Sequence, residues 1–114
     1  MQFDDSLSND ELLMKADETY HKGYYKEAIE YYTSFLEKTK NAKAYNNRGF
    51  TYYKSVGMDF PLPDSGNKEA YIKGLENAIN DFEKALVIDP DYNKAKENLS
   101  FMKRQIQKIA VQSA

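Results

Sequence analysis

The 114-residue sequence predicts an all-α fold of about five helices, built around a repeated pair of helices. Small, aromatic and aliphatic residues recur at helical spacing in two segments, with the same offsets occupied by Ala28, Tyr32, Phe35 and Leu36 in the first and by Ala78, Phe82, Ala85 and Leu86 in the second. The second segment is followed by Pro90, which an α-helix cannot carry in its interior. Because such an internal repeat is typical of stacked helical pairs, we expect a short helical array.

The first helical pair has clear local boundaries. Ser8 and Glu11 have the spacing of a capping box, in which each side chain accepts a hydrogen bond from the other residue's amide, so the first helix should begin just after Ser8. Gly23 should end it, because glycine adopts the left-handed conformation at little cost. The second helix is expected over about residues 25–38, and residues 1–8 are expected to form a flexible arm.

Three further helices are expected in the rest of the chain. The third should span about residues 42–56 and the fourth about 67–88, because two prolines and two glycines exclude helix from the segment between them, 57–66. That segment is either a hydrophobic finger for a partner or a cover for one end of the array. Gly49 costs the third helix about 1 kcal/mol relative to alanine, which indicates a close approach of two helices. Asp91 is the expected N-cap of the fifth helix. The apolar stripe of that helix lies at Ala95, Leu99, Met102, Ile106 and Ile109.

The composition argues against several classes of function. The 16 basic and 18 acidic residues are interspersed and give a net charge of -2, so no basic surface is expected to attract nucleic acid or a membrane. Cysteine is absent, which removes disulfides and thiolate chemistry. The N-terminus is acidic where a signal peptide needs basic residues, and no apolar run approaches the ~20 residues of a membrane span. We therefore expect a soluble, cytoplasmic protein.

The sequence offers little for catalysis or for metal binding. His21 is the only histidine, and its polar neighbours indicate a solvated surface residue rather than a general base. Asp89 and Asp91 lack the ligand number and the turn glycine of a calcium loop. Glycine-rich phosphate loops and a serine nucleophile motif are also absent. We expect no catalytic residue, no metal and no cofactor, and hence a protein that is not an enzyme.

The repeated pattern resembles the tetratricopeptide repeat, an antiparallel helix pair of about 34 residues. The family's aromatic, glycine, tyrosine, alanine, phenylalanine and proline positions are matched in the second pair by Tyr45, Gly49, Tyr52, Ala78, Phe82 and Pro90, and the first pair matches at Leu12, Ala16, Ala28 and Tyr32. Lys40 stands where the first pair would have its proline. The resemblance implies a right-handed α-α superhelix within a single domain, residues 9–111. Its expected parts are repeat one over about 9–41, repeat two over about 42–92 with an insertion near 57–74, and a capping helix over about 92–111.

The resemblance also implies a peptide-binding groove, because in this family the first helix of each pair lines the concave face. The expected lining residues are Leu13, Asp17 and Tyr20 of the first helix, Lys43, Asn46, Asn47, Phe50, Tyr53 and Lys54 of the third, and Lys94, Asn98, Phe101 and Arg104 of the fifth. Asparagines beside aromatic rings suit an extended peptide, whose backbone offers both donors and acceptors. The rings of Phe50, Tyr53 and Phe101 either face this groove or pack on the next helix.

Chaperone-binding members of the family hold a terminal carboxylate with a clamp of lysine, asparagine and arginine. Asn47 and Lys94 match that clamp, whereas Leu13, Asp17 and Asn98 depart from it, and Asp17 would repel a carboxylate. We therefore expect a ligand that is neutral or of mixed charge. The sequence thus predicts a non-catalytic protein-protein interaction module that binds a peptide or an extended segment of a partner protein. The alternative is a self-associating module that buries its aromatic face in a homodimer.

Overall fold

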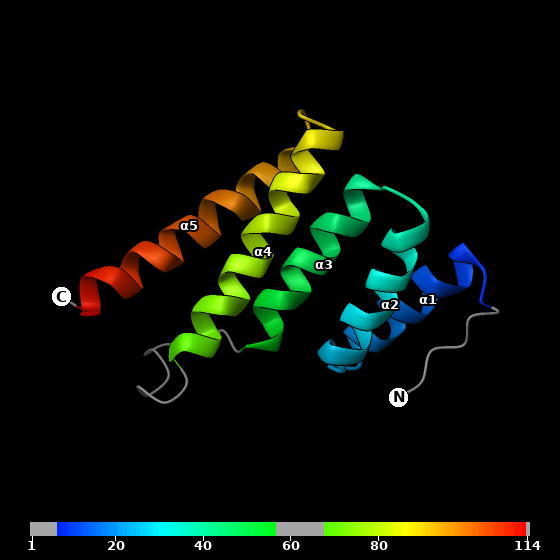
Figure 1. The fold of residues 1–114 in the computed structure, drawn as a ribbon, viewed down its shortest axis with the longest axis horizontal. Coiled ribbons are helices and arrows are strands. Elements are labelled where there is room, and N and C mark those ends of the chain that lie inside the picture. Colours follow the sequence, from blue (N-terminus) through cyan, green and yellow to red (C-terminus); the bar gives the residue numbers. More distant parts are fainter. Residues whose placement is uncertain (1–6, 57–67, 114) are drawn as a thin grey trace.

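The structure, a computed structural model, describes residues 7–56 and 68–113 and has an all-α fold. Its helices are α1 (Asn9–His21), α2 (Tyr25–Lys38), α3 (Ala42–Ser55), α4 (Lys68–Ile88) and α5 (Asn93–Ser113) (Figure 1). The described residues contain no β-strand. The predicted fold class and the predicted number of helices are therefore confirmed.

Each helix packs against the next one in the chain, and α5 also contacts α3. Figure 1 shows the successive helices side by side across the molecule. The molecule measures 49 × 34 × 19 Å along its principal axes, so the array is about two helices thick. In this arrangement α3 is the central element, because it contacts α2, α4 and α5.

Hydrogen bonds at the helix ends explain where the first helices begin and end. The predicted capping box is present, since the Ser8 hydroxyl accepts from the Glu11 amide at 3.2 Å and the Glu11 carboxylate accepts from the Ser8 amide at 3.1 Å. Gly23 has a φ of 84°, in the left-handed region, and follows the last turn of α1. Asn41 caps α3 by accepting from the Ala44 amide at 2.9 Å, a contact that the sequence analysis did not predict.

The predicted N-cap of α5 is wrong by one residue. The helix begins at Asn93, and the Tyr92 carbonyl accepts from the Lys96 amide at 3.2 Å, so Tyr92 occupies the cap position. Asp91 lies in the preceding turn, where its amide donates to the Asp89 carboxylate at 3.2 Å. The Asp89 carboxylate thus stabilises the turn before α5, and Asp91 contributes its backbone amide to that contact.

Two of the predictions fall on parts of the chain outside the described residues. They are most of the N-terminal arm (residues 1–6) and the whole proline-containing segment at 57–66. The described part of the insertion starts with α4, which is 21 residues long against 14 for α2.

The close approach expected at Gly49 is confirmed. A Cβ atom at this position would lie 2.8 Å from Cε1 of Phe82 and 3.1 Å from the backbone oxygen of Ala78, both on α4. Only a glycine therefore allows α3 and α4 to pack at this distance. Ala78 and Phe82 belong to a cluster of buried side chains that also includes Tyr53, Tyr71, Leu75 and Met102. A second cluster is centred on Leu12, Phe35, Leu36 and Tyr45.

A buried ion pair, not indicated by the sequence analysis, fixes α3 to its neighbours. Arg48 of α3 donates to both carboxylate oxygens of Asp81 on α4, at 2.7 and 2.8 Å, and to the Thr33 hydroxyl of α2 at 3.1 Å. Asp81 is only 1% exposed. The rings of Tyr45 and Tyr52 lie 5.6 and 5.8 Å from the guanidinium carbon, within the range of cation-π attraction. One side chain thus connects three helices.

No helix in the described part of the chain combines the length and the apolar character needed to cross a membrane.

Candidate functional site

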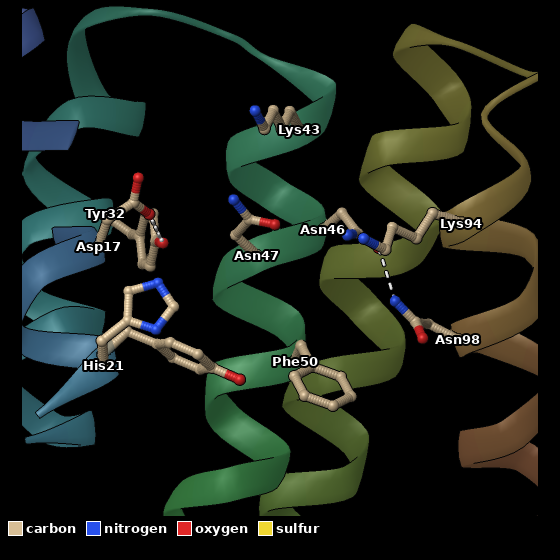
Figure 2. A pocket seen from close by; sticks show the side chains of 10 residues that line it. Asp17, His21, Tyr32, Lys43, Asn46, Asn47, Phe50, Lys94 and Asn98 are labelled. Carbon is tan, nitrogen blue, oxygen red and sulfur yellow. Dashed lines mark hydrogen bonds between the residues drawn. The ribbon is translucent and has the colours of Figure 1, made fainter. Parts of the chain in front are cut away.

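A groove of about 470 Å³ lies between α1, α3 and α5. Its lining residues are Asp17, Tyr20 and His21 from α1, Tyr32 from α2, Lys43, Asn46, Asn47 and Phe50 from α3, and Lys94 and Asn98 from α5 (Figure 2). The groove therefore combines side-chain amides, charges of both signs and aromatic rings. Among the described residues, no group of three histidine or acidic side chains is placed to hold a metal ion.

The structure gathers eight of the thirteen residues that the sequence analysis assigned to the groove. These eight are Asp17, Tyr20, Lys43, Asn46, Asn47, Phe50, Lys94 and Asn98. The remaining five residues, Leu13, Tyr53, Lys54, Phe101 and Arg104, do not line it. Leu13 is half-buried and packs against the core between α1 and its neighbours.

Of the three rings that could face the groove or pack on a neighbouring helix, Tyr53 and Phe101 pack outside the groove, whereas Phe50 lines it and also contacts Tyr53. The Tyr53 ring is only 5% exposed and lies 5.9 Å from the Phe50 ring and 5.6 Å from the Phe101 ring, in edge-to-face contacts. Tyr52, which the family pattern placed in the buried stripe, is only half-buried and flanks Arg48. The buried face of α3 is thus rotated toward Tyr53, because α3 packs against α5 as well as α4.

Lys54 and Arg104, the two cationic residues that were predicted to line the groove but lie outside it, contact the rings of Phe50 and Phe101. The Lys54 ammonium lies 5.7 Å from the centre of the Phe50 ring, and the Arg104 guanidinium carbon lies 6.0 Å from that of Phe101. Both distances are typical of cation-π contacts. Lys54 and Arg104 are therefore placed on the aromatic cluster of Phe50, Tyr53 and Phe101, beyond the groove.

Two further residues, His21 and Tyr32, complete the lining of the groove. His21 is exposed, as a surface histidine should be, and its ring lies 5.4 Å from the ring of Tyr20. Tyr32 was assigned to the buried face of α2 and is indeed only 2% exposed. Its hydroxyl nevertheless reaches the groove and donates to the Asp17 carboxylate at 2.7 Å. A buried tyrosine usually needs a partner for its hydroxyl, and this need is the one signal in the sequence from which such a contact could have been predicted.

The Tyr32 hydroxyl acts as a permanent donor. Burial, and then the hydrogen bond to Asp17, raise the pKa of Tyr32 well above its usual range. The hydroxyl therefore keeps its proton at neutral pH and holds one oxygen of the Asp17 carboxylate. Asp17 itself is exposed, so its other oxygen is accessible from the groove.

A second hydrogen bond orders the opposite wall of the groove. The Asn98 amide of α5 donates to the Asn46 side-chain oxygen of α3 at 3.0 Å (Figure 2). Asn46 is only 2% exposed, so it serves to position Asn98 more than to meet a ligand. Asn47, one residue further along α3, is half-buried and stands between the two walls.

The charges in the groove are separated in space. Asp17 lies on the α1 wall, whereas Lys43 and Lys94 extend from α3 and α5 (Figure 2). Within the ranges that the structure describes, none of these three side chains forms an ion pair. The groove thus presents one carboxylate and two ammonium groups that are available to an incoming molecule.

No protein-family model matches the chain. The sequence is similar to sperm-associated antigen 1 of the mouse, with 31% identity over 109 residues that cover 81% of this chain. It is also similar to sperm-associated antigen 1 of the rat, with 33% identity over 110 residues and the same coverage of this chain. The chain spans 12% of the length of each of these relatives. Most of this chain is therefore similar to one small part of a much longer protein.

Proposed function

We propose that this chain is a non-catalytic protein-interaction module that binds an extended segment of a partner protein in the groove between α1, α3 and α5. The observation that carries the proposal is the groove itself, in which Asn47 stands between walls of opposite charge and Asn98 lies on the α5 wall. Each side-chain amide offers a donor and an acceptor, as does each peptide unit of an extended chain. A volume of about 470 Å³ is within the ordinary range for a ligand site.

The order of the helices supports an assignment to the tetratricopeptide repeat. In this proposal, α1 and α2 form the first repeat, α3 and α4 form the second repeat, and α5 caps the array. The glycine at position 49 and the ring of Phe82 meet where the repeat pattern brings the two helices of a pair together. Similarity to a small part of a longer protein is what an interaction module within a larger chain would show.

The aromatic cluster gives less support to self-association. Phe50, Tyr53 and Phe101 contact one another within a single chain, and Tyr53 is almost fully buried. A second copy would therefore find little free aromatic surface on this face. We accordingly place a partner segment, and not a second copy, in the role of ligand.

The proposal can be tested by selecting a displayed library of random linear peptides on the purified chain. Wild-type protein should enrich related peptides, and Asn47→Ala should lose that enrichment because it removes the amide at the centre of the groove. The matched control is Asn80→Ala, the same substitution at an exposed position of α4 outside the groove, which should enrich the wild-type peptides. Equal far-ultraviolet circular dichroism would show that all three proteins are folded. Failure of the wild type to enrich any peptide, or equal enrichment by Asn47→Ala, would contradict the proposal.

A further inference from the structure

We infer that Asp17 makes the groove selective for a segment of mixed charge, with a basic side chain that pairs with Asp17 and an acidic group near Lys43 and Lys94. This inference rests on the proposed function, and it specifies the chemistry of the ligand. It predicts an arginine or a lysine at one position of the bound segment and an aspartate or a glutamate at another.

The Asp17 carboxylate is fixed in place before any ligand arrives. Its Oδ1 atom accepts from the Tyr32 hydroxyl at 2.7 Å, and Tyr32 is 2% exposed, so the ring beneath it has little freedom to move. A carboxylate has about four lone-pair sites, and the tyrosine uses one of them. The remaining sites face solvent and the groove, since Asp17 is exposed and lines it. A fixed acceptor of this kind loses less conformational entropy on binding than a mobile surface carboxylate does.

Among the described residues, no cation pairs with this acceptor. Lys22 pairs with Glu18 and Arg48 pairs with Asp81, and neither pair involves Asp17. The neighbouring acid Glu18 is thus partnered by Lys22 at the C-cap of α1, whereas Asp17 accepts from the neutral hydroxyl of Tyr32. A guanidinium or ammonium group from a partner would supply the missing charge.

The wall of the groove opposite Asp17 favours a ligand group of negative charge. Figure 2 shows Asp17 and Lys94 on opposite sides of the groove, with Asn47 between them. A ligand with only negative charges would be attracted by Lys94 and repelled by Asp17. A ligand with only positive charges would be attracted by Asp17 and repelled by Lys94. A segment that carries both signs in the matching order is favoured at both walls. The groove therefore selects a ligand by the order of the charged residues along its segment as well as by its net charge.

The test is a double-mutant cycle between the protein and a peptide selected on the wild type. The single basic residue of that peptide is replaced by glutamine, and dissociation constants are measured by fluorescence anisotropy for both peptides. On the wild type this replacement should weaken binding about fivefold, the effect of an exposed ion pair of about 1 kcal/mol. On Asp17→Asn it should have no effect, because the carboxylate is absent.

Two other variants separate Asp17 from general electrostatics. Glu18→Gln removes a negative charge at the next position of α1, outside the groove, and should leave the fivefold effect unchanged. Asp17→Lys should enrich acidic peptides when the library is selected again. Tyr32→Phe keeps the charge but removes the anchoring hydroxyl, so the effect of the basic residue should be smaller than on the wild type.

Different experimental results would contradict the proposed function and the inference about Asp17. If wild type enriches no peptide, the proposed function is wrong and the inference about Asp17 is wrong with it. If enrichment is lost in Asn47→Ala but the peptides have no basic residue, the groove binds a ligand and Asp17 does not select it. The same conclusion follows if replacing the basic residue weakens binding equally on the wild type and on Asp17→Asn.

Discussion

At the scale of single residues, Arg48 has the most consequential set of contacts in the described structure. Its guanidinium group makes three hydrogen bonds, two to Asp81 and one to Thr33, and lies beside two tyrosine rings. A buried pair of this kind is not strong evidence of net stability, because both charges lose their hydration. Its value here is geometric, since it sets the positions of α2 and α4 on the two sides of the helix that carries Asn46 and Asn47.

Removing only one member of this pair should strongly destabilise the protein. We expect Asp81→Ala to lower the free energy of unfolding by about 3 kcal/mol, because Arg48 would keep an unpaired charge in a half-buried position. The double variant Arg48→Met, Asp81→Leu should lose less, because no uncompensated charge remains. Urea unfolding followed by circular dichroism measures both values. If the free energy of unfolding of Asp81→Ala lies within about 0.5 kcal/mol of the wild-type value, the pair is not important for the fold. A difference that small is the contribution of one weak hydrogen bond.

At the scale of the elements, α3 connects the core to the groove. It contacts α2, α4 and α5, and it contributes four of the residues that line the groove. The helix is 14 residues long, and its first turn is fixed by the cap at Asn41. Lys43, Asn46 and Asn47 follow within two turns of that cap, so fraying at this end would displace groove residues directly.

Loss of the Asn41 cap should therefore affect stability and the groove together. Asn41→Ala removes the acceptor for the Ala44 amide and should destabilise the protein by about 1 kcal/mol. Asn41→Asp preserves an acceptor at the same position and should stay close to wild type. Chemical denaturation gives the stability, and hydrogen exchange of the first α3 amides shows whether the loss is local. Identical stability of the alanine and aspartate variants would mean that this cap has no role.

Helix ends were predictable from the sequence because their causes are local. Ser8 with Glu11 and the glycine at position 23 act within a few residues of the ends that they define, and the observed α2 has the predicted bounds. The orientation of α3 was less predictable. Tyr52 and Tyr53 differ by about 100° around the helix, and only the positions of α4 and α5 decide which ring is buried. The Tyr32 contact with Asp17 joins two helices through a long side chain, so spacing along the chain did not reveal it.

At the scale of the whole molecule, buried tyrosines make stability sensitive to high pH. Burial is the main cause that raises the pKa of Tyr20, Tyr32, Tyr53 and Tyr71 above the usual value. An unfolded tyrosine titrates at about 10, so above that pH the unfolded chain releases protons that the folded protein retains. The free energy of unfolding should thus be level between neutral pH and about 9 and should fall as the pH rises through 10.

The contribution of Tyr32 to this fall can be isolated by substitution. Tyr32→Phe should make the alkaline loss of stability smaller, although the variant also loses the hydrogen bond to Asp17 at neutral pH. Tyr24→Phe is the matched control, because Tyr24 is 55% exposed. Urea unfolding at a series of pH values measures the effect. An alkaline fall of the same size in wild type and Tyr32→Phe would contradict this account.

The proposed function depends on the residues that line the groove, and alternate helices of the array supply nearly all of them. Helices α1, α3 and α5 supply nine of the ten lining residues, and α4 supplies none. A partner segment should therefore affect the alternate helices and leave the exposed faces of α2 and α4 unchanged. This distribution distinguishes groove binding from binding at any other surface.

The most direct test is a map of backbone amide chemical shifts during titration with the peptide that the wild-type chain enriches most. We predict the largest changes at groove residues such as Asp17, Asn47 and Lys94, with little change at the exposed Glu30 of α2 and Asn80 of α4. Changes concentrated on α2 and α4 would contradict the proposal, because the peptide would then bind outside the groove.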